Sequence, residues 1–146
     1  MTRLIKSSMA ILLSLVTVVL HADARVESMA IETRLKDAVV GLYDAIAENR
    51  LEQAMRFYHS DAPEVARIRA EIEHSQSAYL QKTTTLSFHC LGQRNHIAFA
   101  KARHRFLRIA GIKFLEKFAE VSYEFRKEGP TWKLWMTQVL QDSETM

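Results

Sequence analysis

The second half of the chain alternates apolar and polar residues with a period of two, which is the pattern of half-buried β-strands. This pattern predicts strands over residues 82–91, 96–108, 112–127 and 131–140. Short turns that contain Gly92, Gly111 or Gly129 separate them. Strands joined by short turns pair with their sequence neighbours in antiparallel order. The sequence therefore predicts an antiparallel meander.

The register of the last two hairpins is predicted from how well each pairing sorts the side chains, because a slip of one residue moves every side chain to the other face. A turn at residues 110–111 places Ala98 beside Tyr123, and a turn at residues 129–130 places Tyr123 beside Met136. Both hairpins then predict the same buried face. Its members are Ala98, Ala100, Ala102, Phe106, Leu115, Val121, Tyr123, Phe125, Trp132, Leu134 and Met136.

The first half of the chain has the spacing of helices. From Ile31 onward, apolar residues recur every three or four positions, which predicts a helix of about 20 residues. A shorter helix is predicted from Leu51 past Tyr58, and a third begins at Pro63. Helices must cover the apolar face of the sheet. The expected fold class is α+β, with three N-terminal helices packed on a curved antiparallel sheet.

An uncharged apolar run occupies residues 9–20, with Arg3 and Lys6 before it and Ala22 and Ala24 after it. The run is shorter than the roughly 20 residues that cross a bilayer as a helix, and the small residues suit a signal peptidase. We expect a signal peptide over residues 1–24, cleaved after Ala24, and a periplasmic or secreted protein without stable membrane insertion. The alternative is an uncleaved membrane anchor. The mature domain is expected over residues 25–142, with a C-terminal tail over residues 143–146.

Charge and residue composition argue against several classes of function. The formal net charge of +3 is too small to favour nucleic-acid binding. The single cysteine, Cys90, excludes an intramolecular disulfide. The histidines after residue 24 show neither HExxH nor HxH spacing, and the sequence has no Gly-rich phosphate loop. We therefore expect no metal site and no cofactor.

The order of the predicted elements resembles the nuclear-transport-factor-2-like, or cystatin-like, fold that ketosteroid isomerases and SnoaL-like polyketide cyclases share. Residues 38–46 and 51–62 are similar to the first two helices of that superfamily, and residues 123–134 resemble its closing hairpin. The resemblance implies a cone-shaped pocket between the helices and the concave sheet.

The resemblance can also be carried over to single residues of the isomerases. Tyr43 falls where these enzymes place a tyrosine that donates a hydrogen bond to the developing oxyanion. Their general base is a carboxylate after the second helix, but neither Asp61 nor Glu64 fits its spacing cleanly. Their second acid corresponds to Ser122 or Tyr123, and neither is a carboxylate. We therefore name no catalytic residue.

The predicted inner face carries small side chains that leave volume to be filled. Either a ligand occupies that volume or a helix packs closely against it. His104 is in phase with this face, so it is either a polar group inside a cavity or a residue that reaches water at the fraying end of the sheet. The aromatic residues are either pocket walls or ordinary core. The candidate pocket residues are Tyr43, Tyr58, Ala98, Ala100, His104, Tyr123 and Met136.

The opposite face of the sheet combines aromatic residues with charges. The predicted register places two opposite-charge pairs on it, Lys101 with Glu120 and Arg105 with Glu116. Phe99, Phe118 and Trp135 make this face too apolar for plain solvent, so they are the candidate interface of a homodimer.

Three functions remain open at this point. The first is a binding module for a small apolar molecule between helices and sheet. The second is an enzyme of the ketosteroid-isomerase or polyketide-cyclase type that uses Tyr43. The third is a dimeric interaction or assembly domain that acts through the outer face of the sheet. A carboxylate pointing into a cavity would favour the enzyme, whereas a filled cavity would favour the third function.

Overall fold

The structure is a computed structural model that describes residues 4–145, with side chains over residues 23–143. The chain divides into two units, residues 1–33 and residues 34–146. The described part of the first unit belongs to helix α1 (Leu4–Ala47). The side chains of the apolar run lie outside the described residues, so the signal peptide stays a prediction. Where side chains are described, no helix is long and apolar enough to span a membrane.

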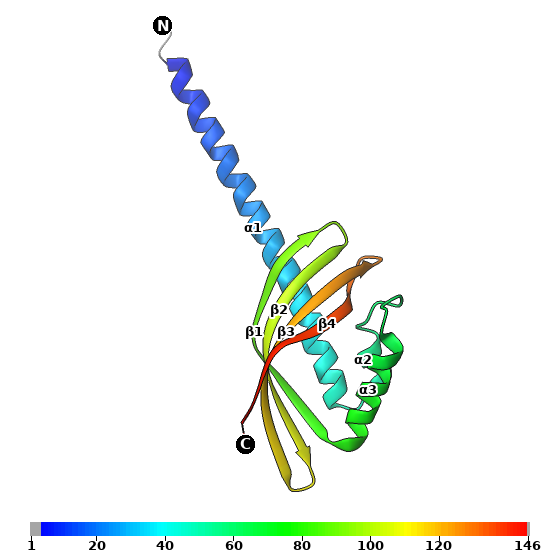
Figure 1. Ribbon diagram of the computed structural model, residues 1–146. Coiled ribbons are helices and arrows are strands. Elements are labelled where there is room, and N and C mark those ends of the chain that lie inside the picture. The colour runs from blue at the N-terminus through cyan, green and yellow to red at the C-terminus, as the bar shows by residue number, and fades with distance from the viewer. Residues whose placement is uncertain (1–3, 146) are drawn as a thin grey trace. The chain divides into compact units, whose positions relative to one another are not determined.

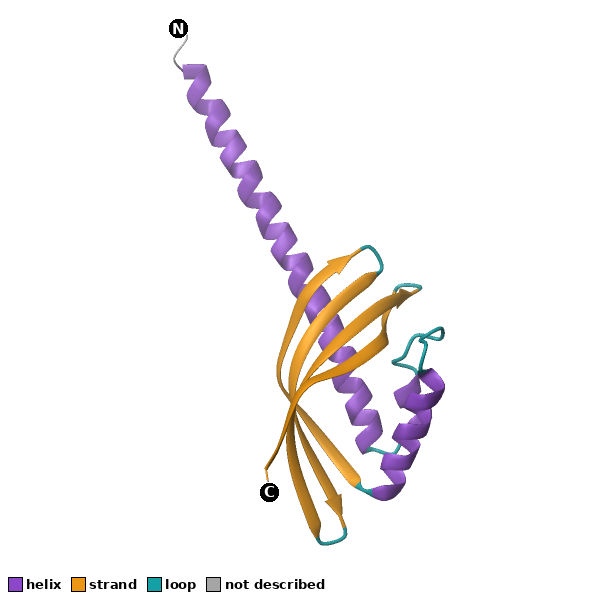
Figure 2. Cartoon of the chain, viewed as in Figure 1, coloured by secondary structure: helices purple, strands orange, loops and turns teal. Residues whose placement is uncertain are grey.

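The second unit contains the C-terminal part of α1, two further helices and one antiparallel sheet (Figure 1). Figure 2 shows that the sheet is strongly twisted and that the helices of this unit lie on one side of it. This arrangement confirms the predicted α+β fold class. The elements are α2 (Leu51–Met55), α3 (Val65–Ala78), β1 (Leu80–Arg94), β2 (Ile97–Ala110), β3 (Lys113–Glu128) and β4 (Thr131–Thr145), with the strands in the order β1-β2-β3-β4.

The pairing of β2 with β3 differs from the predicted register by two residues. The turn lies at Gly111 and Ile112, so Ala98 pairs with Phe125 and Ala100 pairs with Tyr123. A shift of two residues is a full side-chain period, and it therefore leaves every side chain on its predicted face. The predicted ion pairs still form, but each joins diagonal neighbours: Lys101 with Glu120 and Arg105 with Glu116.

A β-bulge corrects the predicted pairing of β3 with β4. Phe125 pairs with Leu134 as predicted, but Glu124 pairs with Met136, so Trp135 is the extra residue. The predicted pair of Tyr123 and Met136 is wrong, because the extra residue makes Met136 the partner of Glu124; the Met136 side chain is 48% exposed. The strand also continues through Thr145, beyond its predicted end and into the segment predicted as a tail.

The chain between α2 and α3 runs along the edge of β4. The His59 amide donates to the Leu134 carbonyl at 2.8 Å, and the Leu134 amide donates to the Phe57 carbonyl at 2.8 Å. An edge strand otherwise exposes unpaired backbone groups. Tyr58 therefore lies outside a helix, which corrects the predicted second helix. The third helix begins at Val65 rather than at its predicted start.

Helix α1 closes the inner face of the two central strands. Ala98 and Ala100 are 0% exposed, and Ala102 is 1% exposed. The Tyr43 ring on α1 lies 5.1 Å from the His104 ring and 5.6 Å from the Phe106 ring, between ring centres. Of the two alternatives for the alanine stripe, close helix packing fits this arrangement. Buried side chains of α1, namely Leu35, Val39, Leu42 and Ala45, complete the core.

We expect Ala100→Leu to overpack this core, because it adds volume where the helix already covers the strand. The free energy of unfolding, measured in urea, should fall by about 1 to 3 kcal/mol. Phe99→Leu on the outer face of the same strand is the control and should change it by less than about 0.5 kcal/mol. Unchanged stability in Ala100→Leu would show that open space lies over this strand.

Candidate functional site

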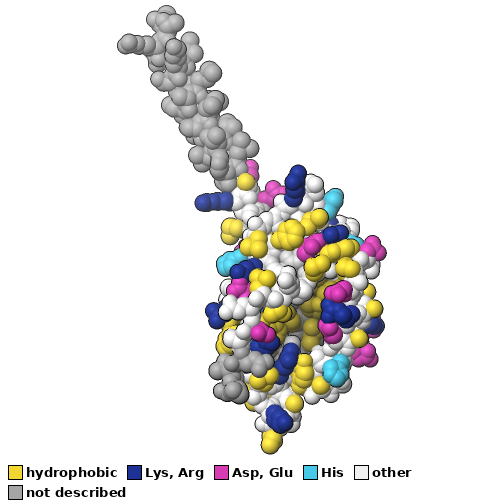
Figure 3. Space-filling model, in the orientation of Figure 1, with side chains coloured by type: hydrophobic (Ala, Val, Ile, Leu, Met, Phe, Trp, Pro, Cys, Tyr) yellow, Lys and Arg dark blue, Asp and Glu magenta, His cyan; other side chains and the backbone are white. Residues whose placement is uncertain are grey.

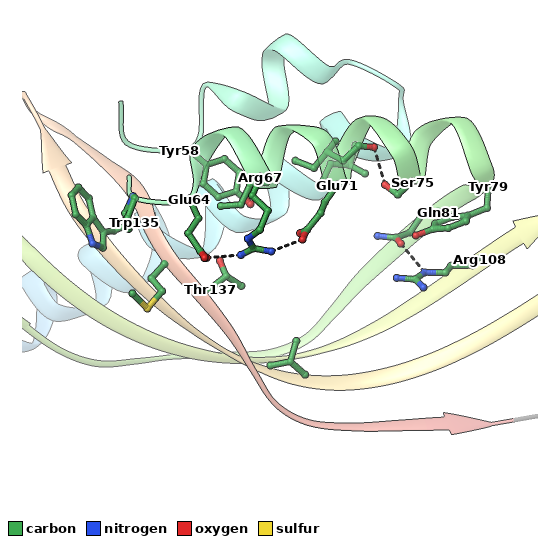
Figure 4. Close-up of a pocket in the computed structure, with 16 residues that line it drawn as sticks. Tyr58, Glu64, Arg67, Glu71, Ser75, Tyr79, Gln81, Arg108, Trp135 and Thr137 are labelled. Carbon is green, nitrogen blue, oxygen red and sulfur yellow. Dashed lines mark hydrogen bonds and ion pairs between the residues drawn. The ribbon is translucent and has the colours of Figure 1, made fainter. Parts of the chain in front are cut away.

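A cavity of about 360 Å³ lies between α3 and the sheet (Figure 4). Most of its wall is apolar or aromatic, contributed by Ile46, Tyr58, Pro63, Ile68, Ile72, Tyr79, Trp135, Met136 and Val139. The polar lining residues are Glu64, Arg67, Glu71, Ser75, Gln81, Arg108 and Thr137. Figure 3 shows hydrophobic side chains within a hollow on one face of the molecule, with charged side chains around it. The cavity can therefore hold a molecule with an apolar body.

Helix spacing and the bulge in β4 together build the walls of this cavity. Ile68 and Ile72 are four residues apart in α3 and lie on the same side of the helix. Beyond the bulge, Thr137 pairs with Tyr123 and Val139 pairs with Val121, so both side chains share the inner face of the sheet. Without the extra residue Trp135, the outer-face side chains of β4 would occupy these positions.

The charged groups of the cavity fall into two sets (Figure 4). Arg67 forms ion pairs with Glu71 on its own helix and with Glu64, the residue just before α3, and its hydrogen bond lowers the pKa of the Glu64 carboxyl. The Arg108 Nε donates to the Gln81 Oε1 at 3.0 Å. The guanidinium carbon of Arg108 also lies 4.7 Å from the centre of the Tyr79 ring. The charge of Arg67 is therefore neutralised by two glutamates, whereas Arg108 is a cation whose partners are neutral groups.

The predicted pocket residues fall into two groups. Tyr58 and Met136 line the cavity, as does Trp135, which was predicted at an interface. Burial raises the pKa of the half-buried Tyr58 hydroxyl, so this hydroxyl is neutral at physiological pH. The remaining predicted residues do not line this cavity and lie instead in the closed core beneath α1: Tyr43, Ala98, Ala100, His104 and Tyr123.

A chain of hydrogen bonds crosses that core. The hydroxyl oxygens of Tyr43 and Tyr123 are 3.1 Å apart, and the Tyr123 hydroxyl lies 2.7 Å from the His104 Nε2. The His104 Nδ1 lies 3.1 Å from the Thr85 Oγ1. His104 is 0% exposed, so the alternative that it reaches water at a fraying end of the sheet is wrong.

Burial keeps every member of this chain uncharged. It lowers the pKa of His104 to about 4, and it raises the pKa of the Tyr43 and Tyr123 hydroxyls. Within the described residues, every buried side-chain nitrogen or oxygen atom has a hydrogen-bond partner. The two acids near the position of an isomerase base, Asp61 and Glu64, are exposed. This series of hydrogen bonds therefore connects α1 to β1, β2 and β3, and it contains no ionised base.

The candidate interface residues lie in three different settings. Phe99 is 49% exposed on the outer face. Phe118 is half-buried, with the Arg103 guanidinium carbon 5.9 Å from its ring centre. Trp135 is also half-buried, between the Arg126 guanidinium at 3.7 Å and the His59 ring at 5.2 Å.

A second cavity, of about 440 Å³, is lined by residues of α1, the segment after α2, the turn before β4 and the first residues of β4. Much of its lining is exposed, including Arg34, Asp37, Arg56, Pro130 and Thr131. Its wall also includes the buried side chain of Trp132. Among the side chains that the structure describes, no group of three His, Cys, Asp or Glu could hold a metal ion.

Sequence reasoning missed the whole contribution of α3 and the set of Tyr79, Gln81 and Arg108. Arg108 could have been found, because it follows His104 and Phe106 at intervals of two on the inner face of β2. Because Arg108 was predicted to be the last residue of the strand, its side chain was not assigned to the inner face. The positions of Tyr79 and Gln81 depend on where α3 ends and β1 begins, which periodicity does not define.

The low pKa of His104 makes stability depend on pH. Below pH 6.5 the unfolded chain binds a proton on this ring that the folded chain binds only near pH 4. The stability due to this group is therefore complete above pH 6.5 and is lost as the pH falls toward 4. We expect the wild type to lose about 3 kcal/mol more than His104→Gln over this range, measured by urea unfolding. Parallel pH profiles of the two proteins would contradict a neutral, buried His104.

Comparisons with known proteins identify the fold and the family. The chain is similar to two solved structures from Novosphingobium aromaticivorans. One is a proposed aromatic ring hydroxylase, with 13% sequence identity and a TM-score of 0.71; the match covers 82% of this chain and 94% of that chain. The other is a proposed scytalone dehydratase, with 8% identity and a TM-score of 0.68; the match covers 83% of this chain and 92% of that chain. A third, from the same organism, is described as an NTF2-like protein with a cystatin-like fold (14%, 0.63, 82% and 86%).

These similarities confirm the predicted nuclear-transport-factor-2-like fold. The search of curated protein sequences finds no match. The family profile described as "Anti-sigma-I factor RsgI9, C-terminal domain" matches residues 41–145, which include most of the second unit and all four strands. The chain therefore has a nuclear-transport-factor-2-like fold and belongs to the family of the C-terminal domain of anti-sigma-I factor RsgI9.

Proposed function

We propose that the second unit binds a small, mostly apolar molecule in the cavity between α3 and the sheet. The observation that carries this proposal is the cavity itself, whose volume of about 360 Å³ falls within the range of small-molecule sites. Its wall combines aliphatic residues of α3 with the aromatic rings of Tyr58 and Trp135. Burying an apolar ligand against such a wall is favourable at roughly 25 cal/mol per Å² of area removed from water.

The second cavity supports binding less well. Each cavity has one buried side chain in its wall, Trp132 in the second and Ile72 beside α3, and many exposed ones, so exposure does not separate them. The cavity beside α3 differs because two helices and three strands contribute to its wall, whereas one helix, one strand and the segments next to them line the second. Binding sites usually enclose most of the surface of their ligand. This difference favours the cavity beside α3.

An enzyme of the ketosteroid-isomerase or polyketide-cyclase type is the second candidate function. It is favoured by the fold shared with a proposed hydroxylase and a proposed dehydratase. Such an enzyme needs a base and an electrophile that both reach the substrate. The Tyr43 hydroxyl instead bonds Tyr123 in the closed core, and His104 is neutral. Two carboxylates, Glu64 and Glu71, do line the cavity beside α3, which is a feature in favour of an enzyme, but both are ion-paired with Arg67. The proposal of binding without turnover therefore depends on these carboxylates remaining paired when a ligand is bound.

We also propose that the protein acts outside the cytoplasm, in the periplasm or after secretion. Support comes from the short apolar run over residues 9–20 and the small residues Ala22 and Ala24 behind it. The intact mass of the exported protein tests this proposal. A chain that begins at Arg25 is expected, whereas a full-length species that sediments with membranes would contradict it.

Filling the cavity should block binding. Ser75 lines the cavity, and Ser75→Trp would place an indole there. N-phenyl-1-naphthylamine, a neutral apolar dye whose fluorescence rises in apolar surroundings, is the probe. We expect its affinity for Ser75→Trp to be at least about tenfold weaker than for the wild type, because each 1.4 kcal/mol of lost contact is a factor of ten.

Ser77→Trp is the matched control for this experiment. Ser75 donates a hydrogen bond to the carbonyl of Ile72, and Ser77 donates one to the carbonyl of His74, so each substitution removes the same kind of bond from α3. Ser77 is exposed and does not line the cavity. Its variant should bind the dye as the wild type does. Equal dye binding by all three proteins would place the dye elsewhere and contradict the proposal.

We propose in addition that two copies associate through the outer face of the sheet. Phe99 and Glu124 are paired on adjacent strands, and the Phe99 side chain is 49% exposed. An exposed aromatic side chain beside charges is typical of interfaces.

Phe99→Glu should produce a folded monomer, because it replaces the exposed aromatic side chain with a second carboxylate beside Glu124. This substitution is a cleaner test than one at Trp135, whose ring packs against Arg126 and His59 within one copy. Sedimentation at micromolar concentration measures the oligomeric state, and the Phe99→Leu control should remain a dimer like the wild type. A wild type that is monomeric under these conditions would rule the dimer out.

A further inference from the structure

We infer that the molecule bound in this cavity carries a carboxylate and that Arg108 binds it. This inference rests on the proposed binding function and names the chemical class of the ligand: an apolar alkyl or aryl body with one carboxylate group.

The charges of the cavity leave one cation without a carboxylate partner. Two arginines and two glutamates line it, so their formal charges balance. Arg67 forms ion pairs with both Glu71 on α3 and Glu64 just before it. Among the described residues, Arg108 forms no ion pair with any carboxylate; its partners are the Gln81 amide and the Tyr79 ring. An anionic ligand would complete the pairing that the protein leaves open.

The neutral partners of Arg108 hold its guanidinium in a defined orientation. The Gln81 oxygen accepts from Nε at 3.0 Å, and the Tyr79 ring lies 4.7 Å from the guanidinium carbon (Figure 4). The bond at Nε leaves the two terminal nitrogens for a ligand. Two parallel N–H groups match the two oxygens of a carboxylate. A guanidinium that is already oriented loses less conformational entropy when the ligand binds.

The half-buried position of Arg108 favours binding of an anionic group by its guanidinium over hydration of the guanidinium by water. Its side chain is half-buried and follows His104 and Phe106 on the inner face of β2. A charged hydrogen bond is stronger where water is partly excluded. Arg103, on the same strand, is exposed on the outer face, where its guanidinium lies over the Phe118 ring. These two arginines differ in setting and not in charge, so they form a matched pair for an experiment.

Decanoate and 1-decanol distinguish the carboxylate from the apolar body, because they share the same alkyl chain. We expect the purified protein to bind decanoate, below its micellar concentration, about tenfold more tightly than 1-decanol by calorimetry, as a charge-assisted hydrogen bond predicts. Arg108→Gln should abolish this preference and leave the affinity for 1-decanol within about twofold. Arg103→Gln should keep the preference. Thermal unfolding followed by circular dichroism shows whether each variant is folded.

Each remaining outcome bears on a different claim. If both probes bind equally to the wild type and Arg108→Gln changes neither, the cavity binds apolar molecules and the inference about the carboxylate is wrong. If neither probe binds, the proposed binding function fails together with the inference. If Arg108→Gln does not fold, Arg108→Lys replaces it, keeping the charge and losing the planar pair of donors. A reduced but remaining preference for decanoate is then expected, and an unchanged preference would overturn the role of Arg108.

Discussion

The inner face of β2 and β3 has to be covered, and the way α1 covers it determines where the molecule can hold a ligand. Alanine at three successive inner positions of β2 lets the helix approach closely, and the Tyr43 hydroxyl comes within 3.1 Å of the Tyr123 hydroxyl. That space is therefore closed. The cavity lies instead beside α3, where the bulge at Trp135 turns Thr137 and Val139 of β4 toward the inner face.

Electrostatics separates the closed core from the cavity. In the core, Tyr43, Tyr123 and His104 are all neutral because burial disfavours their charged forms, and they satisfy one another by hydrogen bonds. A neutral, satisfied network stabilises one arrangement of helix and sheet. The cavity contains charged groups instead. Arg67 is paired with two carboxylates, whereas Arg108 is hydrogen-bonded to the neutral Gln81, so a ligand can supply a carboxylate partner for Arg108.

The sequence predicts the α+β class and the faces of the central strands well, because side-chain parity depends only on a period of two. The register of β2 and β3 was displaced by two residues, and the inner positions still agree. The bulge could not be predicted, because Met136 is more apolar than Thr137 and the pattern favours it inside. The inner end of β4 faces a cavity rather than a packed helix, so polar Thr137 is tolerated there. Tyr58 is not helical as predicted, because the residues on either side of it form backbone hydrogen bonds with Leu134 at the edge of β4.

The central claim is that a ligand binds beside α3 and not beneath α1. Methyl resonances of a labelled sample report on both places during titration with N-phenyl-1-naphthylamine. Ile68 and Ile72 line the cavity, whereas Val39 and Val121 are buried in the core beneath α1. The account predicts that the two isoleucine methyl groups shift with dye concentration while the two valines remain unchanged. Large shifts at Val39 and Val121, with Ile68 and Ile72 unaffected, would contradict it.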